Sequence, residues 1–383
     1  MSESERHWSV PGADVVESIR ELLAEERPAV VATVVGVEGS AYRRPGAKMV
    51  VEEDGVGRGY ITAGCLEDEV IELAGEVLDA GEPRIETYDL MDDRDDIWGL
   101  GVGCNGIIDV LLEPLDSSYE PLVEAFESDR PIGVLTVLSG DVTLGAKAYY
   151  RDGELESESD SGSDAFPAWL TDSLIEPTAT LVEKGKSDAL TVSTDEGEAT
   201  VFVDGIQPSP RLVVFGTGHD VSPVVDLAKR AGFRVTTVGF RGAVDLEARF
   251  PHADEHVTTK PGTVADGVEL DDNTHAVVMT HNFVDDRLTV ETLVDADVPY
   301  IGLMGPRERF EKMLAEFDEE GRAFTDDELD GIYTPIGLNL GEGSPYGIAT
   351  SIVAEVLAVS NGREPKHLTD REGPIHDRVE LGN

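Results

Sequence analysis

Alternating strand-like and helix-like segments fill the second half of this 383-residue chain, and that alternation constrains its fold most strongly. It begins after residues 205–210, where two prolines interrupt regular structure and mark a domain boundary. Helices interleaved with buried strands favour a doubly wound parallel sheet. The expected strands are residues 211–215, 233–238, 275–280 and 299–304.

A last helix is expected from Ser344 and Pro345, because serine caps a helix and proline suits its first turn. Its predicted buried face is Ile348, Ile352, Val353, Val356 and Leu357. This second domain is predicted to span residues 208–362, followed by a polar tail at 363–383.

The first domain, residues 14–206, shows a mixed α/β pattern. Helical spacing of apolar residues predicts helices at 15–23 and 66–78. Apolar runs predict strands at 29–35, 48–51, 59–62, 84–88, 107–112 and 199–203. The acidic, low-complexity stretch 154–164 is expected to be a solvated loop inside this domain.

The net charge of −48, from 78 acidic and 30 basic residues, is spread along the whole chain. It indicates a high-salt, halophilic cytoplasm, where salt screens acidic repulsion and a hydrated surface keeps protein in solution. An acidic surface for one basic partner is the alternative. Nucleic-acid binding is disfavoured because phosphate neutralisation needs a basic face.

The sequence also indicates the cellular compartment of the protein. No apolar run approaches the roughly 18 residues of a membrane span, so no membrane association is expected. The acidic, polar start predicts no secretory signal peptide. Two cysteines cannot make a disulfide scaffold, so the sequence indicates a cytoplasmic protein.

Both cysteines stand in glycine-framed turns, which present a side chain closely to a ligand. Cys65 follows Gly64 at or before the start of a helix, where free N–H groups stabilise a thiolate. Glu67, Asp68 and Glu69 in the same turn oppose that effect. An inert packed cysteine is the other interpretation.

Cys104 lies between Gly103 and Asn105 in a turn that either forms an anion-binding nest or is an ordinary tight turn. A structural zinc site is not expected because the chain has no CxxC and no Cys/His cluster at zinc spacing. The compartment argues against a Cys65–Cys104 disulfide, which the spacing alone leaves open.

Gly216 and Gly218, between a strand and a helix, supply half of a dinucleotide-binding fingerprint. Val221 takes the third glycine position, and no acid ends the next strand, so ordinary NAD recognition is not expected. Arg241 is either a phosphate ligand or a surface arginine. His219 and His281 are expected at the same carboxyl edge of the sheet, where ligands bind.

Two sets of motifs follow one another along the chain. The first half has residues 39–47, 64–67, 88–90 and 103–106, and the second half has residues 216–219, 280–281, 300–305 and 335–338. In this order, over roughly residues 14–362, they resemble the XdhC/CoxI family, the accessory proteins of xanthine dehydrogenase and related molybdenum hydroxylases, and the second set resembles that family's Rossmann-like carboxyl domain. Two departures are Cys104-Asn105-Gly106, where the family commonly has Cys-Gly-Gly, and the Gly239-Phe240 end of a strand that often ends in acids.

The resemblance implies a chaperone, rather than a turnover enzyme, that binds molybdenum cofactor while a terminal sulfur is installed and then inserts it into a hydroxylase. It implies two partners, a xanthine dehydrogenase-type hydroxylase and a cysteine desulfurase; dimerisation and the nucleotide form of the molybdopterin are left open. Cys65 is the expected sulfur near the metal. The expected cofactor-binding residues are Arg43, Arg44, Gly64, Cys65, Glu67, Gly103, Cys104, Asn105, Gly216, Gly218, His219 and His281.

Two other functions fit the sequence. An NAD(P)-dependent oxidoreductase would use the second domain alone for nucleotide binding. A thiol sulfur-carrier protein would need one cysteine that ionises readily.

Overall fold

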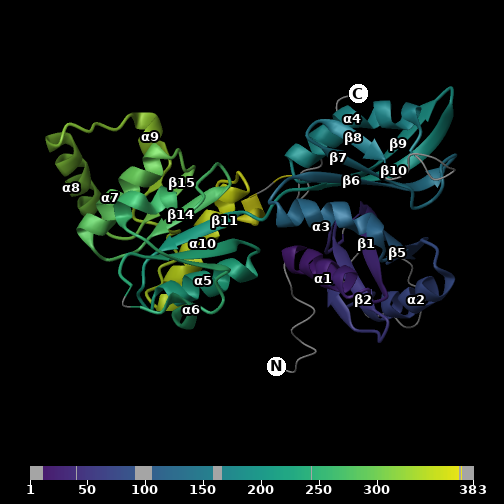
Figure 1. Cartoon of the computed structure of the whole chain (residues 1–383), viewed down its shortest axis with the longest axis horizontal. Helices are drawn as coiled ribbons and strands as arrows, with labels where there is room; N and C mark the ends of the chain where they lie inside the picture. The colour runs from purple at the N-terminus through teal and green to yellow at the C-terminus, as the bar shows by residue number, and fades with distance from the viewer. Residues whose placement is uncertain are drawn as a thin grey trace. The chain divides into compact units, whose positions relative to one another are not determined.

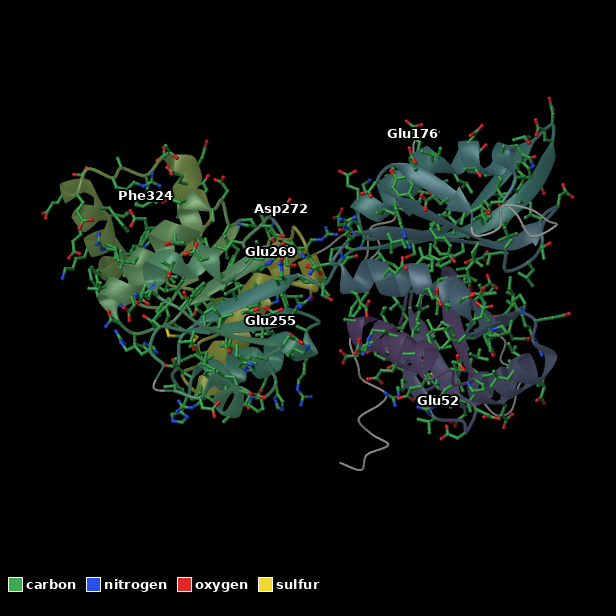
Figure 2. The ribbon with its side chains drawn as sticks, in the orientation of Figure 1. Glu52, Glu176, Glu255, Glu269, Asp272 and Phe324 are labelled. Carbon is green, nitrogen blue, oxygen red and sulfur yellow. The ribbon has the colours of Figure 1, made fainter. Side chains whose placement is uncertain are left out.

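The structure is a computed structural model that describes residues 12–39, 41–90, 106–157, 166–242, 244–370 and 372. These residues form two compact units that divide between Pro208 and Ser209 (Figure 1). Exposed carboxylates occur on both units, among them Glu176, Glu255, Glu269 and Asp272 (Figure 2). None of the helices within the described ranges is long and apolar enough to span a membrane.

The first unit begins with a five-stranded antiparallel sheet in the order β3-β2-β1-β5-β4. Its elements are α1 (Gly12–Ala24), β1 (Ala29–Gly39), β2 (Lys48–Glu52), β3 (Gly57–Gly59), α2 (Glu67–Ala80), β4 (Arg84–Asp89) and β5 (Gly106–Pro114). Sequence reasoning placed a strand at 59–62, whereas β3 ends at Gly59 and turns follow it.

A second antiparallel sheet has the equivalent order, β8-β7-β6-β10-β9. After the short 3-10 turn η2 (Ser117–Tyr119) come α3 (Glu120–Glu127), β6 (Ile132–Gly140), β7 (Lys147–Arg151), β8 (Glu154–Ser157), α4 (Ala168–Glu183), β9 (Ser187–Thr194) and β10 (Gly197–Ile206). The expected loop at 154–164 was therefore wrong at its start, since β8 pairs with β7 there. Residues 158–164 of that loop lie outside the described residues.

The first unit is thus an internal repeat, which the sequence analysis missed. Both halves run helix, three strands, helix, two strands, and pair their strands in the same order. A sequence trace of the repeat exists in two short identities, Arg-Pro at 27–28 and 130–131 and Gly-Ala-Lys at 46–48 and 145–147.

Strand β1 shows how the repeat is packed. Because successive strand side chains point to opposite faces, Val30, Ala32 and Val34 enter the core beneath α2. The alternate residues Ala29 and Val31 enter a second core, which includes residues of α1, α3 and the second sheet. Both faces of β1 are therefore covered, which explains its largely apolar sequence.

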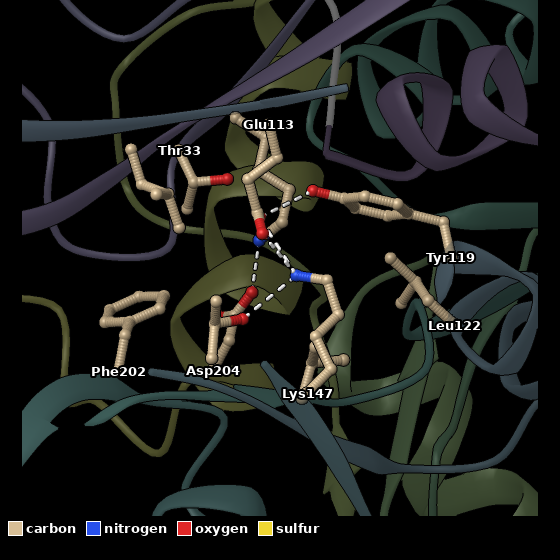
Figure 3. A pocket seen from close by; sticks show the side chains of 11 residues that line it. Thr33, Glu113, Tyr119, Leu122, Lys147, Phe202 and Asp204 are labelled. Carbon is tan, nitrogen blue, oxygen red and sulfur yellow. Dashed lines mark hydrogen bonds and ion pairs between the residues drawn. The ribbon is translucent and has the colours of Figure 1, made fainter. Parts of the chain in front are cut away.

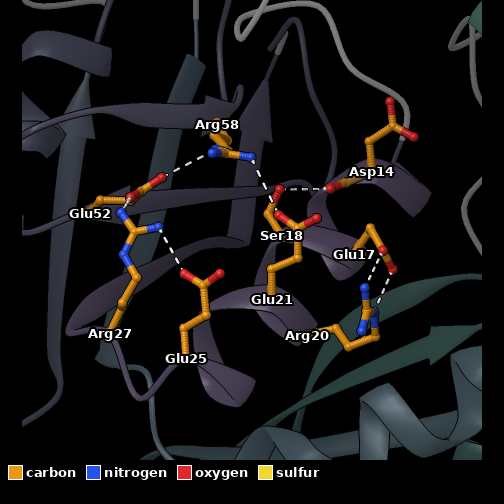
Figure 4. A network of polar contacts seen from close by, with 9 residues as sticks. All are labelled: Asp14, Glu17, Ser18, Arg20, Glu21, Glu25, Arg27, Glu52 and Arg58. Atoms are coloured by element: carbon orange, nitrogen blue, oxygen red, sulfur yellow. Dashed lines mark hydrogen bonds and ion pairs between the residues drawn. The ribbon is translucent and has the colours of Figure 1, made fainter.

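Helix α1 is also tied to the first sheet by charge (Figure 4). Glu52 of β2 is buried and accepts hydrogen bonds from Arg27, just after α1, and from Arg58 of β3 at 3.1 Å. Arg58 also lies 3.8 Å from Glu21 of α1. One buried carboxylate therefore joins the helix end to two strands.

The second unit is a six-stranded, fully parallel sheet in the order β13-β12-β11-β14-β15-β16. The alternation predicted a parallel sheet and four of these strands, but not the short edge strands β13 and β16. Its elements are β11 (Arg211–Phe215), α5 (Val221–Arg230), β12 (Arg234–Gly239), α6 (Leu246–Arg249), β13 (Glu255–Thr258), η3 (Pro261–Asp266), β14 (Thr274–Val278), α7 (Phe283–Asp295), β15 (Tyr300–Leu303), α8 (Arg307–Glu319), α9 (Asp326–Asp330), β16 (Ile332–Tyr333), α10 (Pro345–Ser360) and η4 (Leu368–Asp370).

Helices cover both faces of this sheet, which confirms the doubly wound arrangement. Helices α5 and α10 pack on one face and α7 and α8 on the other. The expected start of α10 is confirmed, because the Ser344 hydroxyl accepts the Gly347 N–H at 3.1 Å. Its expected buried face was wrong at Ile348 and Leu357, which are 38% and 39% exposed.

Candidate functional site

Three connections of the first repeat emerge at one edge of its sheet, which we call the loop edge. They are residues 40–47 between β1 and β2, 60–66 between β3 and α2, and 90–105 between β4 and β5. Antiparallel register brings their bases together: Gly39 pairs with Gly106, and Met49 with Gly59. Arg43, Arg44, Gly64 and Cys65 therefore belong to connections of the same edge.

Three expected site residues, Gly103, Cys104 and Asn105, lie outside the described residues. The strands on either side of their connection are described, and both meet the loop edge. Leu90 donates its N–H to the Gly106 carbonyl at 3.1 Å, which closes the base of that connection.

Arg43 joins two of the connections. Its Nη1 donates to the Tyr60 hydroxyl at 3.2 Å, and its guanidinium lies 4.3 Å from the centre of the Tyr60 ring. Its Nε is buried without a hydrogen-bond partner among the described residues. The Arg44 carbonyl accepts the Ala47 N–H at 3.1 Å, which closes the turn that carries both arginines. Sequence reasoning did not single out Tyr60.

The Cys65 turn is held by Glu67 and Thr62. Gly64 has φ +99°, which favours glycine, and the Cys65 N–H donates to the Thr62 hydroxyl at 3.1 Å. Glu67, only 1% exposed, accepts from the Thr62 N–H at 2.7 Å and the Leu66 N–H at 3.1 Å. The N–H groups of Thr62, Cys65 and Leu66, just before α2, are thus occupied by side chains of the turn itself.

Cys65 itself is partly exposed and packs against the core beneath α2, as do Ala41 and Leu90 from the other two connections. Tyr88 is buried in that same core, and burial raises the pKa of its phenol well above the ordinary value. All three connections therefore touch one core.

In the second unit, the expected crevice lies where the strand order reverses, between the carboxyl ends of β11 and β14. His281, after β14, has φ 59°, and its Nε2 lies 2.7 Å from Asp220 Oδ2, just after the β11 turn. This pair joins the two loops of the crevice. Both His219 and His281 are exposed, and sequence reasoning missed Asp220.

The turn after β11 differs from the glycine-rich turn of a dinucleotide-binding site. A Cβ at Gly216 would lie 2.7 Å from the Met279 carbonyl, so this glycine permits close approach of β14. Val221, in place of the third glycine, is fully buried at the start of α5. Arg241 is 67% exposed and pairs with Asp285 at 2.7 Å, so the surface alternative describes its position.

Among the described residues, no group of three or more His, Cys, Asp or Glu side chains is placed to hold a metal ion.

His275 of β14 is expected to make the stability of the second unit depend on pH. It is 6% exposed between Phe233 and Tyr300, and burial lowers the pKa of its imidazole. Below its ordinary value of about 6.5, the unfolded chain binds a proton that the folded chain takes up only at lower pH. Stability should therefore fall as the pH drops from 7 to 5, by at most about 1.4 kcal/mol per pH unit for this group.

The measurement is the urea unfolding free energy of the second unit at pH 7 and pH 5, for wild type and His275→Leu. The variant should lose less stability than wild type over that range. An equal loss in both proteins would show that His275 does not contribute.

Comparison with known proteins identifies the chain. Residues 22–89 match the XdhC and CoxI family, and residues 212–356 match the XdhC Rossmann domain. A Bacillus subtilis (strain 168) protein named as a probable xanthine dehydrogenase subunit is 30% identical over 340 residues, covering 88% of this chain and 94% of that protein. This chain belongs to the XdhC and CoxI family.

Two further similarities cover nearly the whole chain. The "Molybdenum cofactor insertion chaperone PaoD" of Escherichia coli (strain K12) is 20% identical over 93% of this chain and 94% of that protein. A crystal structure described as a xanthine dehydrogenase from Bacillus halodurans has a TM-score of 0.71 and 27% identity, over 93% of this chain and 97% of that one. The expected family and its fold are thus confirmed.

The expected site residues are distributed over the two regions that match XdhC families. The first covers Arg43, Arg44, Gly64, Cys65 and Glu67, and the second covers Gly216, Gly218, His219 and His281. Cys104 and its two neighbours fall between them.

Proposed function

We propose that this XdhC-family chain binds molybdenum cofactor as cargo at the loop edge and delivers it to a xanthine dehydrogenase-type hydroxylase. The observation that carries the proposal is that the connections bearing Arg43 and Cys65 contact one another and one core at a single sheet edge. The name of the E. coli relative, a molybdenum cofactor insertion chaperone, supports the same role.

The residues at the loop edge suit this cargo chemically. The cofactor combines a soft, sulfur-ligated metal with an anionic phosphate. A cysteine sulfur suits the former, and arginine suits the latter because its planar guanidinium presents several donors. We assign Cys65 to the metal side and Arg43 and Arg44 to the phosphate, with Glu67 and Gly64 holding the Cys65 turn.

Gly103, Cys104 and Asn105 are proposed as further cofactor contacts, because their connection starts and ends at the loop edge. For the second unit taken by itself, we propose that Gly216, Gly218, His219 and His281 hold a phosphate or nucleotide group. Protection of the cofactor during sulfuration would bring a cysteine desulfurase to the chain as its second partner.

The test is to purify the chain from cells that make the cofactor and to measure bound pterin and molybdenum. Cys65→Ala is expected to lower bound molybdenum at least about tenfold, equivalent to about 1.4 kcal/mol of binding free energy. Cys104→Ala, measured alongside it, should cause a smaller loss. Absence of pterin from wild type, or unchanged binding in Cys65→Ala, would contradict the proposal.

Three assays separate the rival functions. Because two relatives are named xanthine dehydrogenase, xanthine oxidation by the purified chain alone is measured, and none is expected. An NAD(P)H fluorescence titration should show no saturable binding, since the β12 end lacks the ribose-binding acid. The pH dependence of thiol alkylation should show no readily ionised cysteine, as a sulfur carrier would require.

A further inference from the structure

The repeat of the first unit places the same side chains at the same positions twice. Thr33 pairs across strands with Lys48, and Thr136 pairs with Lys147. An acid occupies the equivalent place in the last strand of each half: Glu113 opposite Val31, and Asp204 opposite Val134. Each half therefore contributes one threonine, one lysine and one carboxylate to the interior.

The ion pairs are exchanged between the two halves (Figure 3). Lys48 of the first half pairs with Asp204 of the second. Lys147 of the second half pairs with Glu113 of the first, at 2.8 and 2.9 Å to the two carboxylate oxygens. All four side chains are largely buried around a cavity of about 20 Å³, room for about one water.

The two halves differ in the loops above these pairs. The β1–β2 connection over Lys48 carries Arg43 and Arg44, whereas the β6–β7 connection over Lys147, residues 141–146, carries no basic residue. The long β4–β5 connection is matched by only two residues, 195 and 196, between β9 and β10. The first half therefore carries the connections that we propose to bind ligand, and the second half repeats only the strands and buried charges beneath them.

The Lys48–Asp204 pair anchors the base of the arginine loop. Lys48 Nζ also donates to the Gly46 carbonyl at 3.3 Å, and Ser187 donates to Asp204 Oδ1 at 2.6 Å. A Cβ at Gly46, which has φ +94°, would lie 2.6 Å from the Ser187 hydroxyl. The arginine loop therefore packs directly against the second half of the repeat.

We infer that Lys48 and Asp204 are positioning residues that hold residues 41–47 in the conformation that presents Arg43 and Arg44 to an anionic ligand. The equivalent pair, Lys147 and Glu113, joins the halves without supporting a ligand loop. The claim that this loop binds the cofactor rests on the proposed function. The claim that Lys48 and Asp204 anchor the loop does not.

Matched double variants test the inference. Lys48→Met/Asp204→Asn and Lys147→Met/Glu113→Gln each remove one buried pair and leave no lone buried charge, so their effects on stability should be similar. Hydrogen exchange is followed at Gly46 and Ala47, which donate to Val34 and Arg44, and at their counterparts Gly145 and Ala146, which donate to Val137 and Thr143.

The first variant should accelerate exchange at Gly46 and Ala47 at least tenfold, and the second should do so only at Gly145 and Ala146. Equal exchange at Gly46 and Ala47 in both variants would overturn the inference. If either double variant fails to fold, Gly46→Ala and Gly145→Ala are compared instead, because both glycines have positive φ and both would bring a Cβ against the opposite half.

Cofactor binding is the second readout. The Lys48/Asp204 variant should lose at least tenfold in affinity, and the Lys147/Glu113 variant less than twofold. Equal losses would reduce the pair to a structural role and contradict the inference. If wild type binds no cofactor, the proposed function fails, while the exchange result still decides whether this pair anchors the loop.

Discussion

Lys147→Met alone is expected to lower the unfolding free energy of the first unit by about 3–5 kcal/mol. Lys147 and Glu113 are only 5% and 8% exposed, and the substitution leaves the carboxylate buried without its cation. The Tyr119 hydroxyl, which donates to Glu113 at 2.9 Å, cannot replace the lost charge. Urea unfolding followed by tryptophan fluorescence measures this, because Trp8, Trp98 and Trp169 all precede the second unit.

Two controls accompany this measurement. Adding Glu113→Gln to Lys147→Met should restore part of the loss, because the lone charge is then removed. Glu76→Gln breaks a pair with Arg84 in the same unit, in which both side chains are exposed, and should change stability by less than about 1 kcal/mol. A single Lys147→Met variant as stable as wild type would show that the buried pair has no such role.

Phe215→Ala is expected to lower the unfolding free energy of the second unit by about 3–5 kcal/mol. Phe215 is fully buried at the end of β11, directly before the Gly216 turn, and stacks with Phe240 at 6.1 Å between ring centres. Its removal leaves a cavity that the central strand of a parallel sheet cannot easily close. Hydrogen exchange of amides in β11 and β14 reports this unit, which contains no tryptophan.

The control for this prediction is Leu340→Ala, in the same unit but 52% exposed, which should shift stability by less than about 0.5 kcal/mol. Similar exchange in both variants would mean that Phe215 contributes no more than an exposed side chain. The pair of His281 and Asp220 at the crevice should also become more mobile in Phe215→Ala, because the turn before Asp220 begins at this residue.

Much of the second unit could be predicted because its signals are local. Buried parallel strands are continuous apolar runs, and Ser344 and Pro345 start a helix through contacts within one turn. The missed features depended on distant residues. Helical spacing predicted Ile348 and Leu357 as core, but the exposed side of α10 was decided by which residues of α5 and β15 it packs against.

The glycine-framed Cys65 turn was visible in the sequence, but its support was not. Glu67 resembles an ordinary acidic residue at a helix start, and only the folded turn shows its carboxylate buried against Thr62 and Leu66. The Arg-Pro identity at 27–28 and 130–131 and the Gly-Ala-Lys identity at 46–48 and 145–147 could have shown the repeat, and the second of them marks its two equivalent lysines.

The sequence by itself determined the family, the parallel sheet of the second unit and four of its six strands, since these depend on local periodicity and short motifs. It also singled out the loops that we propose to bind the cofactor. Only the tertiary structure decided which buried charges neutralise one another. Lys48 and Asp204 are 156 positions apart and Lys147 and Glu113 are 34 apart, and each lysine pairs with the acid of the other half. Burial forces every such charge to find a partner, but only the packing of the two sheets determines which partner lies within reach.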